Sequence, residues 1–262
     1  MTTPRSYQTE AIITKKTKMG EADRILTLYT LRIGKIQGFA KSVRKTRSKL
    51  SGHLELLTHS QVSLARGRNI DTITDSQTID SFVKLKSDLD LSACALYTVE
   101  LVNQFTAEQI ENEPLFRLLL GTLKRLEEEE VDRELTLRYF ELYLLDAVGY
   151  RPQVRQCVSC RSPLKEGDNY FCPSAGGIVC LGCRPRHSGC CLISVNAIKM
   201  LRYIQENGYE NVSRFKVGEA LHREVSSVLR GYLKYLLERD VKSAAWLDEL
   251  RAVARQDTTS LL

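Results

Sequence analysis

Four cysteines form two pairs whose spacing suits metal binding. Cys157 and Cys160 make the first Cys-x-x-Cys pair, and Cys180 and Cys183 make the second after nineteen intervening residues. Each such turn presents two thiolates on one side of the chain, and the connecting loop can bring the two pairs together around one Zn²⁺. Four protein ligands leave no open position on zinc, so the spacing predicts one structural Zn²⁺ that takes no part in chemistry.

The alternatives are a disulfide framework or separate core cysteines. The N-terminal residues lack the apolar stretch of a secretory signal, so we expect a cytoplasmic protein whose thiols stay reduced, which favours metal over disulfides for the two pairs. Cys172 lies between the pairs and competes as a ligand, although it lacks a partner at the Cys-x-x-Cys spacing. His187 is expected to be a surface residue.

Sequence motifs of common catalytic sites are absent. The chain has no Walker or Rossmann glycine loop, no His-Glu-x-x-His and no Gly-x-Ser-x-Gly. An acid–base pair assembled from distant positions stays open as an alternative. The sequence therefore favours a binding protein over an enzyme.

Positive charge is densest in one short segment. Five of the nine residues from Lys41 to Lys49 are Lys or Arg and none is acidic, in a chain whose net charge is +6. A basic loop of this kind can hold phosphates without reading sequence, since phosphates look alike beside every base. The segment predicts contact with nucleic acid, with a solvated surface loop as the alternative.

The elements around this segment have the pattern of a β-barrel. Five stretches rich in β-branched and apolar residues, at 9–15, 24–30, 35–43, 56–64 and 70–82, are separated by glycine or polar turns. Five short strands without long helices predict a closed barrel, most commonly an OB-fold. In the third strand, alternation places small or apolar residues inside and a mixture of cations and an aromatic ring outside, as on single-strand binding surfaces. The inner set is Ile36, Gly38, Ala40 and Ser42, and the outer set is Lys35, Gln37, Phe39, Lys41 and Val43.

From residue 84 the apolar period becomes helical. Helices are expected up to Phe105, from the N-cap Asn112, from about Glu134 to Gly149, from the N-cap Ser194 to Gly208, and around 217–236. The cysteine segment carries a short strand at 169–172 and a glycine turn at 176–177.

These elements predict an α+β protein: an N-terminal five-stranded OB-fold barrel, then a mainly α-helical domain with an inserted four-cysteine zinc ribbon. A chain of 262 residues exceeds the usual size of one domain. We predict boundaries at 1–82 for the barrel, 83–152 with 194–250 for the helical domain, and 153–193 for the zinc module. No apolar run approaches the ~20 residues that span a bilayer.

The order of these features resembles the RecO family of bacterial recombination mediators. The resemblance covers nearly the whole chain and is carried by residues 20–25, 34–35, 40–41, 44–45, 48–55, 140–142 and 149–150, and by the cysteine pairs with Phe171, Gly176 and Gly177 between them. Each motif is short, but their order is specific.

The resemblance implies an activity without turnover in the bacterial cytoplasm, at the nucleoid. The family binds single- and double-stranded DNA, anneals complementary strands, and helps to load the RecA recombinase onto strands covered by single-strand-binding protein (SSB), usually with RecR. It implies zinc binding by the four paired cysteines, and DNA contact by Arg24, Lys35, Lys41, Arg44, Lys45, Arg47 and Lys49. We add Phe39 to the predicted DNA contacts because strand alternation places it on the outer face of the third strand.

In relatives, the acidic, apolar C-terminal tail of SSB docks on the helical domain. Here Arg138 is the candidate for pairing with the tail carboxylate, and Leu118 and Phe105 are candidates for an apolar slot. The alternative for Arg138 is an exposed helix charge.

Two other classes of function compete with this one. One is a zinc-ribbon scaffold or transcription-associated module that binds protein partners, with the basic loop incidental. The other is a nuclease with an unrecognised acidic site, which a coordinatively closed zinc disfavours.

Overall fold

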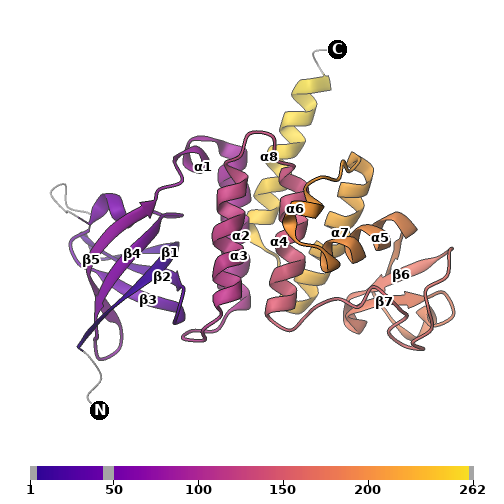
Figure 1. The fold of residues 1–262 in the computed structure, drawn as a ribbon, viewed down its shortest axis with the longest axis horizontal. Coiled ribbons are helices and arrows are strands. Elements are labelled where there is room, and N and C mark those ends of the chain that lie inside the picture. Colours follow the sequence, from indigo (N-terminus) through magenta and orange to yellow (C-terminus); the bar gives the residue numbers. More distant parts are fainter. Residues whose placement is uncertain (1–4, 44–49, 260–262) are drawn as a thin grey trace. The chain divides into compact units, whose positions relative to one another are not determined.

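The computed structural model describes residues 5–43 and 50–259 (Figure 1). The chain divides into two compact units. We call residues 1–127 with 246–262 the barrel unit, and residues 128–245 the cysteine unit.

The barrel unit begins with five strands, which confirms the five predicted ones. They are β1 (Ser6–Met19), β2 (Asp23–Thr30), β3 (Gly34–Ala40), β4 (His59–Ala65) and β5 (Asp71–Asp80). They close in the order β1-β2-β3-β5-β4, with β3 and β5 parallel and the other pairs antiparallel. The five-stranded closed barrel confirms the predicted OB-fold.

Alternation along β3 places its side chains as predicted within the strand. Ile36, Gly38 and Ala40 are buried, whereas Gln37 is exposed and Phe39 is half-buried. A Cβ at Gly38 would come within 2.9 Å of the Ile73 side chain, so a larger residue there would crowd the interior.

The expected positions of two residues after β3 are wrong. The strand ends at Ala40, Ser42 lies in a turn with a positive φ of 53°, and Val43 is buried in the barrel core. Alternation no longer applies once the chain has turned.

Helices α1 (Val83–Ser87), α2 (Leu89–Phe105) and α3 (Glu113–Leu126) follow the barrel in the same unit. Helix α8 (Lys242–Thr259) begins in the cysteine unit and belongs to the barrel unit from Trp246 onward. The helical pattern from residue 84 is interrupted at Asp88, whose side chain accepts a hydrogen bond from the Leu91 amide and starts α2. The predicted N-cap Asn112 is confirmed, because its side chain accepts from the amide of Leu115.

The cysteine unit combines helices with a small sheet. Its helices are α4 (Arg133–Ala147), α5 (Val195–Glu206), α6 (Tyr209–Val212) and α7 (Glu219–Leu237). Strands β6 (Asn169–Cys172), β7 (Gly177–Cys180) and β8 (Cys191–Ile193) form an antiparallel sheet in the order β7-β6-β8. The predicted strand at 169–172 and the N-cap Ser194, which accepts from the Ala197 amide, are confirmed.

The predicted domain boundaries follow changes of pattern along the sequence and remain predictions. Helices α2 and α3 belong to the same compact unit as the barrel. Within the described part of the chain, no helix combines the length and apolarity that crossing a membrane requires.

Candidate metal centre and nucleic-acid interface

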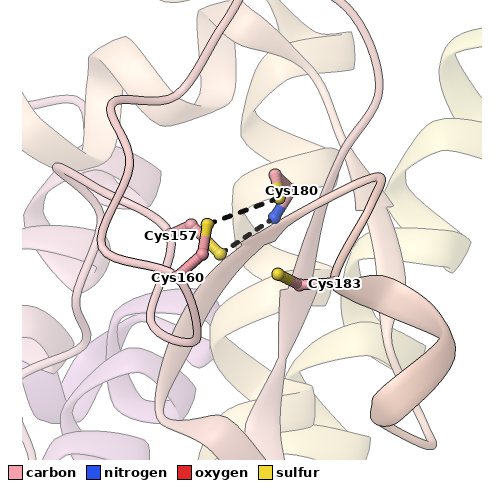
Figure 2. A group of neighbouring side chains, drawn as sticks. All are labelled: Cys157, Cys160, Cys180 and Cys183. Carbon is pink, nitrogen blue, oxygen red and sulfur yellow. Dashed lines mark hydrogen bonds between the residues drawn. The ribbon is translucent and has the colours of Figure 1, made fainter.

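The four paired cysteines converge in the cysteine unit. The Sγ atoms of Cys157, Cys160, Cys180 and Cys183 all lie within 4.8 Å of one another. Figure 2 shows the four side chains gathered in one place. The Sγ atoms of Cys160 and Cys180 are 3.8 Å apart. Tetrahedral zinc with Zn–S bonds of about 2.3 Å separates its sulfur ligands by about 3.8 Å, so the cluster fits a four-thiolate metal site.

Local backbone bonds shape the two cysteine turns. In the first, the Arg161 amide donates to the Cys157 carbonyl at 2.9 Å, and Arg161 takes a positive φ of 60°. In the second, the Cys183 amide donates to the Cys180 carbonyl at 3.0 Å. The Cys180 amide also donates to Cys157 Sγ at 3.4 Å, which joins the two turns (Figure 2).

A glycine lets the chain before the first pair lie against β7. The Ile178 amide donates to the Gln153 carbonyl, and the Val158 amide donates to the Ile178 carbonyl. A Cβ at Gly177 would lie 2.3 Å from the Gln153 carbonyl oxygen, so a side chain there would separate these segments.

The four thiols differ in acidity. Hydrogen bonds from the side chain and backbone of Ser162 lower the pKa of Cys160 to about 6. The hydrogen bond with Cys180, followed by burial, raises the pKa of Cys183 to about 12. Crowded sulfurs that cannot all ionise without a counter-charge are suited to a divalent cation, which replaces the remaining protons.

Cys172 does not compete as a ligand in this structure. It forms a disulfide with Cys190, eighteen residues later, whereas the four cluster cysteines are free thiols. The expectation of reduced thiols therefore fails for this pair. Sequence spacing gave no signal of it, because the pairing of β6 with β8 brings Cys172 close to Cys190. His187 is half-buried, and its Nε2 atom forms a hydrogen bond with Ser159 Oγ at 2.6 Å.

The outer surface of β1, β2 and β3 carries part of the predicted nucleic-acid interface. Strand register aligns Thr17 with Ile25 and Phe39. Phe39 and Ile25 are half-buried, and Lys41 beyond the end of β3 is exposed. The result is a partly apolar strip with a cation at its end, a combination that suits stacked bases and phosphates.

Arg24 lies at one end of the barrel. Its register partner Ala40 faces the interior, and its guanidinium lies 3.6 Å from Glu55 Oε1. Lys16 donates a hydrogen bond to the other carboxylate oxygen of Glu55, Oε2. The positive charge of Arg24 is therefore partly neutralised by Glu55.

Lys35 points outward as predicted, but its ammonium group is used within the protein. It donates to the backbone carbonyls of Asn103, at 2.7 Å, and of Thr106. Burial lowers the pKa of Lys35. The cation thereby satisfies carbonyls at the C-terminal end of α2, where positive charge is favourable.

The remaining predicted DNA contacts lie outside the described residues: Arg44, Lys45, Arg47 and Lys49. The chain that leads to them is held by Asp23, whose carboxylate accepts from the Ser42 amide at 2.6 Å.

Sequence reasoning missed two lysines near this surface. Lys15 aligns with Thr27 and Gln37 across the sheet, and Lys18 lies opposite Arg24 in the register of β1 and β2. Both lysines are exposed. Three lysines among the four residues 15–18 were the available signal.

The three residues assigned to the SSB tail lie in different units. Leu118 and Phe105 are half-buried in the barrel unit. Arg138 is completely buried in the cysteine unit, where it donates to Glu141 at 2.7 Å, so the alternative of an exposed helix charge is wrong. A tail carboxylate could reach this guanidinium only after the surrounding side chains had moved.

Comparison with known proteins identifies the family. Residues 1–82 match the family model "Recombination protein O N terminal", and residues 86–245 match "Recombination protein O C terminal". A DNA repair protein RecO of Dehalococcoides mccartyi is 50% identical over 250 residues, covering 95% of this chain and 98% of the relative. The DNA repair protein RecO of Roseiflexus sp. is 41% identical, covering 96% and 88%. That of Alkaliphilus metalliredigens is 32% identical, covering 88% and 94%. Closed barrel, helical region, cysteine cluster and these matches over nearly the full length agree, and the chain belongs to the RecO family of DNA repair proteins.

Proposed function

We propose that the protein binds single- and double-stranded DNA through its barrel, anneals complementary strands, and assists the loading of RecA onto strands covered by SSB. The outer surface of the OB-fold barrel supports this most directly. It combines Phe39 with the exposed cations Lys15 and Lys41, and the sequence continues into the basic run from Arg44 to Lys49. Arg24 and Lys18 add charge at the barrel end, and Lys35 contributes by positioning the neighbouring backbone.

Annealing follows from this charge without catalysis of a bond change. Two DNA strands repel each other through their phosphates, and cations held on one protein surface lower that repulsion. Base pairing then supplies the sequence specificity. The protein therefore acts by binding and not as an enzyme.

We propose that Cys157, Cys160, Cys180 and Cys183 hold one structural Zn²⁺. Closed four-thiolate coordination stabilises the fold around β6 and β7, and all four ligands come from the protein. Four protein ligands leave no open position on the zinc, so we assign it a structural role and no part in annealing.

The SSB tail is better accommodated by a pocket in the cysteine unit than by the buried Arg138. This pocket, of about 330 Å³, is lined largely by apolar side chains, among them Met200, Tyr203 and Phe215. Lys199 and Lys216 also line it, and both are exposed. Apolar walls with two cations complement an acidic, apolar tail. RecR and RecA complete the proposed set of partners, in the bacterial cytoplasm at the nucleoid.

The salt dependence of DNA binding tests the central proposal. Affinity for a single-stranded oligonucleotide is measured against salt concentration for the wild type and for Arg44→Ala/Lys45→Ala/Arg47→Ala. Each lost phosphate contact lowers the magnitude of the log–log slope by about 0.7, so three lost contacts should lower it by about 2.

A matched control removes three exposed cations from helices, as Arg117→Ala/Arg223→Ala/Lys234→Ala. The control should keep the wild-type slope. An unchanged slope in the basic-loop variant would remove the assignment of this loop to DNA.

A further inference from the structure

Besides the basic outer surface, the barrel unit contains a polar pocket of about 380 Å³ beside β3. The loop from β4 to β5 forms one wall, and the segment after α2 forms the other. The side chains that give the pocket its chemistry are Tyr7, Gln37, Arg66, Arg68, Asn69 and Glu108.

Asp71 fixes the wall formed by the loop. One of its carboxylate oxygens accepts from the Tyr7 hydroxyl at 2.7 Å, and the other accepts from the Gly67 amide at 3.0 Å. Burial, together with the bond to Asp71, raises the pKa of Tyr7, which keeps the phenol neutral. The Arg66 guanidinium lies over the Tyr7 ring, 4.8 Å from its centroid. The loop thus presents a paired aromatic ring and guanidinium plane in a defined place.

Backbone contacts with β3 fix the opposite wall. The Gln109 amide donates to the Lys35 carbonyl at 2.8 Å, and the Gln37 side chain donates to the Glu108 carboxylate at 2.7 Å. A Cβ at Gly34 would lie 1.9 Å from the Ile110 carbonyl oxygen, so glycine is required for this close approach. These contacts hold the segment after α2 firmly against β3.

The mixture of groups suits a nucleobase better than an isolated phosphate. A phosphate site needs donors and positive charge, and the carboxylate of Glu108 would repel it. A base edge presents amino donors and carbonyl or ring-nitrogen acceptors, which match carboxylate and amide side chains. Bases also stack on aromatic rings and on arginine planes, as the Tyr7–Arg66 pair allows. The volume lies near the lower end of the roughly 300–1,000 Å³ range of ligand pockets, enough for one nucleotide.

We propose that this pocket receives one unstacked base of a single DNA strand. The base stacks on the Tyr7–Arg66 pair, its edge faces Gln37, Asn69 and Glu108, and Arg68 binds the adjoining phosphate. This inference rests on the proposed DNA-binding function.

The position of the pocket on the barrel supports a continuous path for the strand. Gln37, Phe39 and Lys41 occupy alternate positions at and just beyond the end of β3, so the strip of β3 leads from the basic end of the strand to the pocket. In OB-folds, the face of the second and third strands and the loop between the fourth and fifth strands are common sites of oligonucleotide binding.

The test compares a single-stranded 20-mer with an abasic strand of the same length and phosphate count. The wild type should bind the base-containing strand about tenfold or more tightly, since stacking contributes at each base. Arg66→Lys keeps the charge but removes the planar group, so it should lose at least about fivefold of this preference while keeping the salt slope. Arg117→Lys on the exposed face of α3 is the matched control and should keep both.

A second variant makes the test independent of how Arg66→Lys folds. Asn69→Ala changes an exposed loop side chain and should also reduce the preference for bases. In the wild type, stacking on the Tyr7–Arg66 pair should quench the fluorescence of a 2-aminopurine placed in the strand. This quenching should be weaker in both pocket variants.

The outcomes separate this proposal from the broader one. If both pocket variants keep the wild-type preference and quenching, the base pocket is refuted, while a steep salt slope of the wild type would leave DNA binding intact. If the wild type binds neither strand at low salt, the proposed function itself fails.

Discussion

The ammonium group of Lys35 donates a hydrogen bond to the carbonyl oxygen of Asn103 over 2.7 Å and thereby joins the third barrel strand to the end of α2. The same residue accepts a backbone hydrogen bond from Gln109. One lysine therefore holds the chain after α2 through both its side chain and its backbone. Strand alternation and the family resemblance assigned this cation to DNA, but in the structure its ammonium group bonds to backbone carbonyls and stabilises the fold.

Replacement of Lys35 should affect stability more than phosphate binding. Lys35→Met removes two hydrogen bonds made by a charged donor, and we expect a loss of roughly 1–3 kcal/mol in the free energy of unfolding. The salt slope for single-stranded DNA should stay near that of the wild type. Lys41→Ala is the matched comparison at an exposed position and should lower the slope by about 0.7 with little change in stability. Urea unfolding and DNA titrations measure the two effects, and the reverse pattern would make Lys35 a DNA contact.

The metal content of the purified protein should be about one zinc per chain. Cys160→Ser removes one of four ligands and should lower zinc occupancy and the stability of the cysteine unit. The control Cys172→Ala/Cys190→Ala removes two cysteines of the same segment that bond to each other, so it should keep the zinc. Elemental analysis decides between them. Loss of zinc in the control, with retention in Cys160→Ser, would contradict the ligand assignment.

The disulfide should make stability sensitive to reduction. Cys172 and Cys190 are separated by 18 residues, and closing a loop of about this length is worth about 3 kcal/mol in the unfolded-chain model. A phosphine reductant, which does not compete as a thiol for zinc, should lower the urea midpoint of the wild type. Cys172→Ala/Cys190→Ala should start lower and show no response to the reductant. Equal responses of the two proteins would mean that the bond does not form in solution.

Acid should weaken the contact between Asp132 and His222. Burial raises the pKa of the Asp132 carboxyl, but hydrogen bonds from His222 and from the Leu135 amide outweigh this, and its pKa is lowered overall. A lowered carboxyl pKa gives stability that is present above the unfolded value of about 3.9 and is lost as pH falls through the folded value.

Asp132→Asn keeps a capping oxygen for α4 but carries no charge to titrate. Its urea midpoint should be lower than that of the wild type at pH 7, and the difference should shrink below about pH 4. Because acid also protonates the cysteine cluster in both proteins, the difference between them isolates Asp132. A difference that is constant with pH would show that the carboxylate charge contributes no stability.

Local patterns in the sequence determined most of the architecture. Alternation along β3, the N-caps Asn112 and Ser194, and the two cysteine pairs each depend on a few neighbouring residues, so short-range physics predicts them. The five strands were enough to predict the barrel, because few other closed folds suit five short strands.

Tertiary structure decided the roles of several of these residues. Lys35 faces outward as predicted, but its ammonium group bonds to the end of α2, and that hydrogen bond joins positions 68 residues apart. Arg138 is buried with Glu141 although a cation in a helix is usually exposed. Cys172 and Cys190 meet only because β8 returns beside β6.

The pocket beside β3 that contains Tyr7 and Arg66 is built from β1, the β4–β5 loop and the segment after α2, which are distant in sequence. No local pattern could indicate them, since only the closed chain brings them together.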